Sequence, residues 1–305
     1  MMPRYSIFAL LILLGISVSC TTKEQFASTI AYPHPLPDSI PLSFMPNVVS
    51  SQGLDFNAAF SPDGKSFFFS RSNNGQWDIY VSRHNGARWS NPILASFSDS
   101  KFSEADPAFS PDGKLYFISN RPKQLGDSLS DFDIWFIEPI DTGAWTEPEN
   151  FARINSDSAE YYISFSTNGN VYFGSSRAGG FGAEDIYRSR LVNGQYSVPE
   201  NLGPAINSPE SDHDPCIWPN EELLIFKSEN RGNSYGQADL YVSRSMPANQ
   251  WTQAVNLGDK FNTETYEYCP YLTPDQKYFF FSSELDVKWI DANFLESYVA
   301  KLNVD

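Results

Sequence analysis

A short motif that recurs about every 50 residues constrains the fold of this chain more than any other feature. The sequence Phe-Ser-Pro-Asp-Gly-Lys occupies residues 60–65 and returns unchanged at residues 109–114. Weaker copies occupy residues 165–169, 217–220 and 272–275. Each copy is followed by an aromatic-rich apolar run, and such runs bounded by turn residues are typical of buried strands. The motif therefore predicts a tight turn between two strands, repeated five times.

Two further strands complete each repeat. The third strand begins with an acidic residue, and an aromatic residue follows two positions later. We expect this strand to begin at Asp78, Asp133, Asp185, Asp239 and Glu296 in the five repeats. The fourth begins near an aromatic residue and often a proline, which suits an outermost strand, and its expected starts are Trp89, Trp145, Tyr196 and Trp251. Four strands per repeat, without useful helical periodicity, predict an all-β fold. We expect a five-bladed β-propeller of four-stranded antiparallel blades around a central channel.

The two ends of the repeat region complement each other. The fifth repeat ends shortly after its third strand, whereas residues 40–49 precede the first repeat at the spacing of a fourth strand. We therefore expect residues 40–49 to pair with a strand around residues 298–302, because this pairing would close the ring and cover two open strand edges. The propeller domain is then residues 40–305. The alternative is a loose N-terminal tail beside a last blade of three strands.

The first 20 residues carry a predicted export signal. Arg4 precedes the apolar run of residues 7–16, which is too short to span a membrane but suits the core of a signal peptide. The segment from Ser17 to Cys20 resembles a bacterial lipobox, with Ser17 where leucine is common, so Cys20 is the predicted lipidation site. Residues 21–39 are polar and contain prolines, which is typical of a flexible tether. Ordinary cleavage without acylation is the alternative.

The repeat as a whole resembles a known family. Over residues 53–302 the repeat is similar to the WD40-like propeller repeat of TolB-type proteins. The shared pattern is, in order, an acid, the Phe-Ser-Pro-Asp-Gly-Lys turn, an aromatic strand, Ser-x-Arg, a Gly-rich loop, Asp-Ile-Tyr and Trp-x-x-Pro. Residues 175–187 are especially similar to repeats of bacterial envelope lipoproteins and of propellers beside OmpA-like peptidoglycan-binding domains. The resemblance implies a binding or scaffolding role in the cell envelope.

One column of the repeat holds an acid in every blade, near the start of the innermost strand. The five acids are Asp55, Glu104, Glu160, Asp212 and Glu267. Basic residues in loops on the same expected face are Arg71, Arg121, Arg177 and Arg231. We expect these side chains to surround one mouth of the channel as candidate ligand-binding groups. The alternative is that they pair with one another and with backbone N–H groups, because a residue repeated in every blade usually has a structural role.

A site for a single ligand should break the symmetry of the repeat, and residues next to the acid column do so. The candidates are Tyr161, His213 and Tyr268, with the neighbouring residues Tyr162, Asp214 and Cys269. His213 lies between two acids, but alternate residues of a strand point to opposite faces and the sequence indicates no further ligands. We therefore predict neither a metal site nor a cofactor. Cys216 and Cys269 are expected to be buried free thiols rather than a disulfide.

The charge of the chain narrows the class of partner. With 37 acidic residues against 21 Lys and Arg, the net charge is −16, which opposes binding to a nucleic acid because that requires clustered positive charge. We expect a noncatalytic protein, a monomer or part of a larger complex, that is anchored to the membrane only through its lipid. It would hold a segment of an envelope protein or a glycan at the channel mouth.

A five-bladed glycoside hydrolase is the alternative function. Such an enzyme would use two carboxylates in the funnel of the propeller as its catalytic groups. Catalytic carboxylates should differ from their repeat counterparts in context and pKa, whereas the five acids of the column look alike. The sequence therefore favours binding over catalysis.

Overall fold

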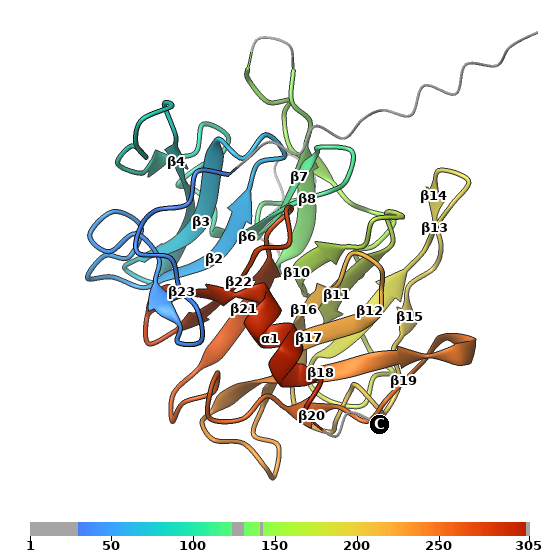
Figure 1. Cartoon of the computed structure of the whole chain (residues 1–305). Helices are drawn as coiled ribbons and strands as arrows, with labels where there is room; N and C mark the ends of the chain where they lie inside the picture. Colours follow the sequence, from blue (N-terminus) through green and yellow to red (C-terminus); the bar gives the residue numbers. More distant parts are fainter. Residues whose placement is uncertain (1–29, 124–130, 141–142, 303–305) are drawn as a thin grey trace, which may run out of the picture.

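The computed structural model describes residues 30–123, 131–140 and 143–302, and these form a five-bladed β-propeller of four-stranded antiparallel blades (Figure 1). The fold predicted from the repeat is thus confirmed. The innermost strands are β2 (Asp55–Phe60), β6 (Glu104–Phe109), β10 (Glu160–Phe165), β16 (Asp212–Ile217) and β21 (Glu267–Leu272). The second strands are β3 (Ser66–Asn73), β7 (Leu115–Ser119), β11 (Val171–Ser175), β17 (Leu223–Glu229) and β22 (Tyr278–Ser283).

The outer half of each blade consists of a longer third strand and a very short fourth strand. The third strands are β4 (Gln76–Arg83), β8 (Asp133–Ile137), β12 (Asp185–Ser189), β18 (Ala238–Met246) and β23 (Asp286–Asp291). The fourth strands are β5 (Ile93–Leu94), β9 (Glu149–Asn150), β15 (Glu200–Asn201), β20 (Val255–Asn256) and β1 (Leu42–Ser43). Two small additions, the hairpin β13 (Leu191–Val192) and β14 (Gln195–Tyr196) and the strand β19 (Gln250–Trp251), extend the third and fourth blades.

The recurring motif forms the turn between the first two strands, as its residue types require. In the first blade Ser61 Oγ donates to Asp63 Oδ1 at 2.6 Å, and the same carboxylate oxygen accepts from the Lys65 N–H at 3.1 Å. Gly64 follows with a φ of 66°, in the left-handed region that glycine adopts at little cost. These bonds satisfy the polar groups of the turn and so fix the register of the two strands.

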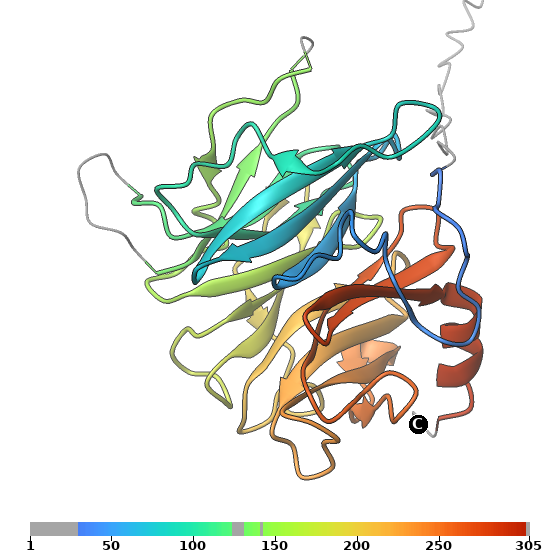
Figure 2. The same ribbon diagram turned by 90° about the vertical axis from the view of Figure 1, so that its left-hand side faces the viewer.

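An N-terminal strand closes the ring, as predicted, but its partner differs from the prediction. Leu42 of β1 pairs with Trp289 of β23, and the Phe44 N–H donates to the Val287 carbonyl at 2.8 Å. Figures 1 and 2 show this segment beside the last blade. The expected partner, residues 298–302, is not a strand, because it comprises the end of the helix α1 (Ala292–Val299) and the residues after it.

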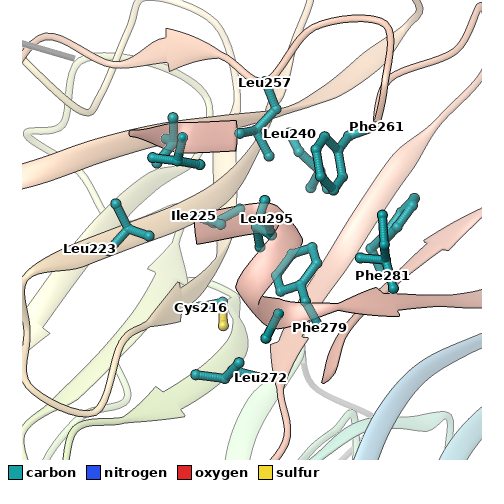
Figure 3. Packing of buried hydrophobic residues seen from close by; sticks show 14 of the residues in the cluster. Cys216, Leu223, Ile225, Leu240, Leu257, Phe261, Leu272, Phe279, Phe281 and Leu295 are labelled. Atoms are coloured by element: carbon teal, nitrogen blue, oxygen red, sulfur yellow. The ribbon is translucent and has the colours of Figure 1, made fainter. Parts of the chain in front are cut away.

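Helix α1 also replaces the third strand that was expected to begin at Glu296. Asp291 caps the helix by accepting the Phe294 N–H at 3.0 Å, and the side chains of Leu295 and Val299 are buried. Figure 3 shows Leu295 in the hydrophobic cluster between the fourth and fifth blades, which also contains Cys216 and Phe279. Because the helix covers this cluster, it contributes to the core of the domain. In the described part of the chain, no helix has the length and apolarity that a membrane span needs.

The described residues before β1 lie against the propeller. Ile30 is buried, and Tyr32 packs against Tyr278 and Trp289, although these positions fall within the segment 21–39 that was predicted as a tether. Cys20 and the predicted signal peptide lie outside the described residues.

Candidate functional site

The five column acids are the first residues of the innermost strands, and all five are completely buried. Each carboxylate accepts a hydrogen bond from a backbone N–H four or five residues earlier in the chain. The donors and distances are Ser51 to Asp55 (2.7 Å), Asp99 to Glu104 (3.0 Å), Ser156 to Glu160 (2.8 Å), Ser208 to Asp212 (2.5 Å) and Thr263 to Glu267 (2.8 Å). The acids therefore fix the loop that leads into each blade.

Four of these acids form ion pairs with the arginines that the sequence placed on the same face. The pairs are Asp55 with Arg71 (2.5 Å), Glu104 with Arg121, Glu160 with Arg177 (2.9 Å) and Asp212 with Arg231 (2.6 Å). Each guanidinium also lies over aromatic rings of its own blade, as Arg177 does over Tyr187 at 4.8 Å. Glu267 differs, because its carboxylate is bonded by Thr263 and Ser283. The column acids and the four arginines thus find their hydrogen-bond and ion-pair partners within their own blades or in the loops that lead into them.

The third residue of every innermost strand lies in a β-bulge and has a positive φ. These residues are Asn57 (63°), Asp106 (56°), Tyr162 (39°), Asp214 (53°) and Cys269 (50°), and we call them the axial cluster. Such φ values are uncommon outside glycine, so their repetition at one register indicates a fixed feature of the blade.

The bulges direct the axial cluster toward the centre of the ring, where side chains of different blades meet. Cys269 Sγ lies 3.7 Å from Asp106 Oδ1, and the Cys269 N–H donates to Asp214 Oδ2 at 3.0 Å. Tyr162 Oη donates to the Pro270 carbonyl at 2.6 Å. Cys216 and Cys269 are both buried free thiols, as predicted. The two carboxylates of the cluster, Asp106 and Asp214, therefore both contact Cys269.

A pocket of about 560 Å³ opens above the axial cluster. Tyr161, His213 and Tyr268 line it, so the structure brings these three sequence-predicted residues together. The five column acids and the four arginines are not among the lining residues, which instead include Asp106, Asp214 and Cys269 of the axial cluster. The candidate site is therefore formed by the second and third residues of the innermost strands, whereas the column acids are the first residues.

Aromatic rings form a nearly continuous arc around this pocket, and we call them the aromatic arc. In order they are Tyr268, Phe56, Trp77, Phe132, Tyr161 and His213, with neighbouring ring centres 5.2 to 6.1 Å apart. Four of them are the second residue of an innermost strand. In the second blade this position is Ala105, and Trp77 and Phe132 bridge the gap. The arc gives the pocket a largely apolar wall.

A polar chain from the fourth blade crosses the pocket wall. Lys227 on β17 lies directly opposite His213 on β16, and its Nζ is 2.9 Å from His213 Nε2. His213 Nδ1 is 2.7 Å from Asp214 Oδ1, and Lys227 also pairs with Glu229 at 2.6 Å. Lys227 can donate to Nε2 only while that atom carries no proton, so the contact fits a neutral imidazole with its proton on Nδ1.

The surroundings of His213 act on its pKa in opposite directions. Burial is the largest influence and lowers the pKa, and the charge of Lys227 lowers it too, but the charge and hydrogen bond of Asp214 raise it to about 9. A histidine with that pKa is protonated at neutral pH, whereas the 2.9 Å contact with Lys227 requires an unprotonated Nε2, so the geometry here is that of the neutral form. Uptake of the second proton would require the ammonium group of Lys227 to leave Nε2, because the two positive charges would repel at this distance.

The two carboxyl groups of the axial cluster differ in acidity. Burial, and then the charge of Asp214, raises the pKa of Asp106 to about 8, so Asp106 is protonated at neutral pH. Burial acts on Asp214 in the same direction, but His213, Lys227 and the Cys269 N–H together lower its pKa. The pocket floor therefore offers a neutral carboxylic acid beside an ionised carboxylate. In the described ranges, no group of three or more His, Cys, Asp or Glu side chains is placed to hold a metal ion.

Sequence reasoning missed Asp106, Lys227 and Trp77. The signal for Lys227 was present, because the residues opposite the second position of each innermost strand are Ser70, Ile118, Gly174, Lys227 and Ser282. A single cation in a column of uncharged residues breaks the repeat as clearly as His213 does. Asp106 had no such signal, because Asp214 occupies the same position of the fourth blade.

Comparisons with known proteins give the fold alone. No family model matches the chain, and no curated protein matches it. TolB from Acinetobacter baumannii is 14% identical with a TM-score of 0.50 over 81% of this chain, which spans only 54% of that TolB chain. An α-L-arabinofuranosidase from Lactobacillus brevis is 10% identical with a TM-score of 0.52, over 85% of this chain and 92% of that chain. Arabinanase Arb43A from Bacillus subtilis is 10% identical with a TM-score of 0.51, over 78% of this chain and 94% of that chain. At these identities, the likenesses show the fold and do not distinguish one function from another.

Proposed function

We propose that this protein is a noncatalytic binding propeller of the cell envelope, whose axial pocket holds a segment of another protein or a glycan. The observation that carries the proposal is the contrast between the column acids and the residues that line the pocket. The column acids repeat in every blade and are satisfied internally, whereas the pocket above them is lined by residues that differ from blade to blade. Asymmetry of this kind is expected where one ligand is recognised.

The envelope location rests on the N-terminal sequence. The apolar run of residues 7–16 and the lipobox-like Cys20 support export followed by lipid attachment. The resemblance of the repeats to those of envelope lipoproteins supports the same location.

Binding can be tested with the purified protein against arrays of oligosaccharides and of decapeptides. The variant Trp77→Ala removes one ring of the aromatic arc, and Ile93→Ala, which changes an exposed residue on the outermost strand of the same blade, is the matched control. We expect ligands that bind the wild-type protein and the control but not Trp77→Ala. The proposal fails if Trp77→Ala retains the full binding profile, or if no member of either array binds.

A glycoside hydrolase is the second candidate, and one observation favours it. Asp106 and Asp214 have pKa values pushed in opposite directions, which is the relationship between a general acid and its carboxylate partner in such enzymes. Binding remains the better proposal because Asp214, which would have to act on the reacting carbon as nucleophile or through a water, is more than nine-tenths buried. Asp214 is also already bonded to His213 and Cys269, which leaves it little access to a reacting atom. Hydrolysis of an oligosaccharide that Asp106→Asn abolishes would establish the enzyme instead.

A further inference from the structure

We infer that the ligand of the axial pocket is a neutral sugar ring, held with its hydroxyl groups toward the axial cluster and its C–H face against the aromatic arc. This inference rests on the proposed binding function and names the class of ligand. It is drawn from the charges, the spare hydrogen-bonding capacity and the apolar wall of the pocket.

The charged groups at the pocket already have partners, including Glu184, which accepts a hydrogen bond from the Ser211 hydroxyl. Lys227 pairs with Glu229 at 2.6 Å, and Asp214 accepts hydrogen bonds from His213 and from the Cys269 N–H. At the rim, Glu284 pairs with Lys288 at 3.1 Å. An anionic ligand would have to displace Glu229 from Lys227 to gain a counter-charge inside the pocket, and a cationic ligand would have to displace the donors to Asp214, and both of these groups are buried. A neutral ligand meets no such cost.

The polar groups with spare capacity are neutral. Asn57 is 2% exposed, and its Oδ1 has no hydrogen-bond partner in the described structure. In the adjacent Asp106, carboxyl oxygen Oδ1 has long contacts, 3.5 Å from Asn57 Nδ2 and 3.7 Å from Cys269 Sγ. A buried polar atom without a partner is costly, and because Asn57 lies behind the pocket lining, a buried water is the expected donor to its Oδ1. Asp106 does line the pocket, and sugar hydroxyls both donate and accept, which suits its protonated carboxyl group.

The wall of the pocket complements the apolar side of such a ring. Phe56 contacts Trp77 edge to face and Tyr268 at a tilt, with ring centres 5.8 and 5.9 Å apart, and all three residues line the pocket. Sugar rings carry C–H groups on their faces and hydroxyls at their edges, so one ligand can use both surfaces. A peptide segment in the same position would bring an N–H and a carbonyl for each residue into a wall that offers few partners.

The test is an array of neutral oligosaccharides (fragments of xylan, arabinan, glucan and mannan). Galacturonic acid oligomers, glucosamine oligomers and decapeptides are the comparison arms. We expect the neutral fragments to bind best. Asp106→Ala and Trp77→Ala should each weaken that binding at least about tenfold, whereas Asp106→Asn, which keeps a neutral group that donates and accepts, should stay within about threefold of the wild type. Circular dichroism verifies that each variant is folded.

The remaining outcomes separate the inference from the function it rests on. If a charged oligomer or a peptide binds best and Trp77→Ala abolishes that binding, the neutral sugar is wrong and the binding function stands. If Asp106→Ala binds the neutral oligosaccharides as tightly as the wild type does, the inference is also contradicted, because the ligand would then not reach the axial cluster. If no arm binds the folded wild-type protein, both the ligand and the function are wrong.

Discussion

Tyr32 Oη donates a hydrogen bond of 2.7 Å to Asp275 Oδ1, which joins the segment before the first blade to the turn of the fifth. The ring of Tyr32 lies 4.4 Å from that of Tyr278 in an edge-to-face contact. These contacts and the pairing of β1 with β23 act together, because each holds the N-terminal segment against the last blade. The two chain ends are thus joined by side chains as well as by a strand.

The closure of the ring should depend on Phe44, which is completely buried among Phe67, Phe280 and Trp289. Phe44→Ala should lower the free energy of unfolding by about 3–5 kcal/mol, because it leaves a cavity between the first and last blades. Urea unfolding followed by tryptophan fluorescence measures this. Ile40→Ala, at an exposed position of the same segment, should change stability by less than about 0.5 kcal/mol. Equal effects of the two changes would contradict the role of the segment.

The column acids should contribute to stability according to whether an arginine accompanies them. Glu160→Gln should cost about 3–5 kcal/mol, because it leaves the Arg177 guanidinium, bonded at 2.9 Å, without its counter-charge. Glu267→Gln should cost only about 1 kcal/mol, because its partners are neutral. Burial also raises the pKa of Glu267, so the folded state already disfavours its charge. Chemical unfolding of both variants tests this order, and the reverse order would overturn it.

Gly174 should be required for the position of His213. A Cβ atom at Gly174 would lie 2.7 Å from His213 Cβ, so Gly174→Ala should move the imidazole away from Lys227 and cost about 1–3 kcal/mol. At Gly53 the nearest atom to an added Cβ is 3.5 Å away, which makes Gly53→Ala a suitable control. The imidazole resonances are the direct readout, because the chain has only three histidines. Unchanged His213 resonances in Gly174→Ala would refute the expected displacement.

Stability should fall as the pH rises through the range in which Asp106 remains protonated only in the folded state. Its pKa is raised to about 8 in the folded protein, against about 4 in an unfolded chain. The stabilisation is therefore complete below about pH 4 and is lost progressively up to about pH 8. The shift of Asp214 is in the opposite direction and acts below this range.

The comparison with Asp106→Asn isolates this contribution. The stability of the wild type relative to Asp106→Asn should decrease between about pH 4 and pH 8 and then level off. Urea midpoints measured at several pH values give the difference directly. Parallel profiles would mean that Asp106 has an ordinary pKa and is ionised in the pocket.

Lipid attachment at Cys20 should decide where the protein is found. Cys20→Ala should move it from the membrane fraction to the soluble fraction, because the predicted anchor is the acylated cysteine. Intact-mass analysis of the wild type should show the added acyl groups. An unmodified mass together with an unchanged distribution would support ordinary signal-peptide cleavage.

The repeat predicted the architecture because its turn chemistry is local. Residues such as Ser61 and Asp63 determine the turn by bonds within a few positions, so their recurrence identifies the first two strands of each blade. The fifth blade was harder, because Glu296 and Tyr298 match the acid and aromatic of a third strand but belong to α1. The two-residue turn of Glu284 and Leu285 instead starts β23 about ten residues earlier than expected.

The candidate site was predictable only in part. The acid column was placed correctly at the start of the innermost strands, and Tyr161, His213 and Tyr268 do line the pocket. The orientation of Asp106 depends on a bulge, which shifts the alternation of side chains by one residue and has no local sequence signature here. The pairing of Lys227 with His213 depends on strand register, which only the fold provides.

The five bulges have a consequence for how this scaffold can change. Each places one side chain at the axis while the strand ladders on either side continue. Asn, Asp, Tyr, Asp and Cys now occupy these five positions, and of these Tyr162 and Cys269 also pack in a hydrophobic cluster between blades. New side chains at the three polar positions, Asn57, Asp106 and Asp214, would alter what the channel accepts without removing a member of that cluster, which makes them the natural targets for redesigning specificity.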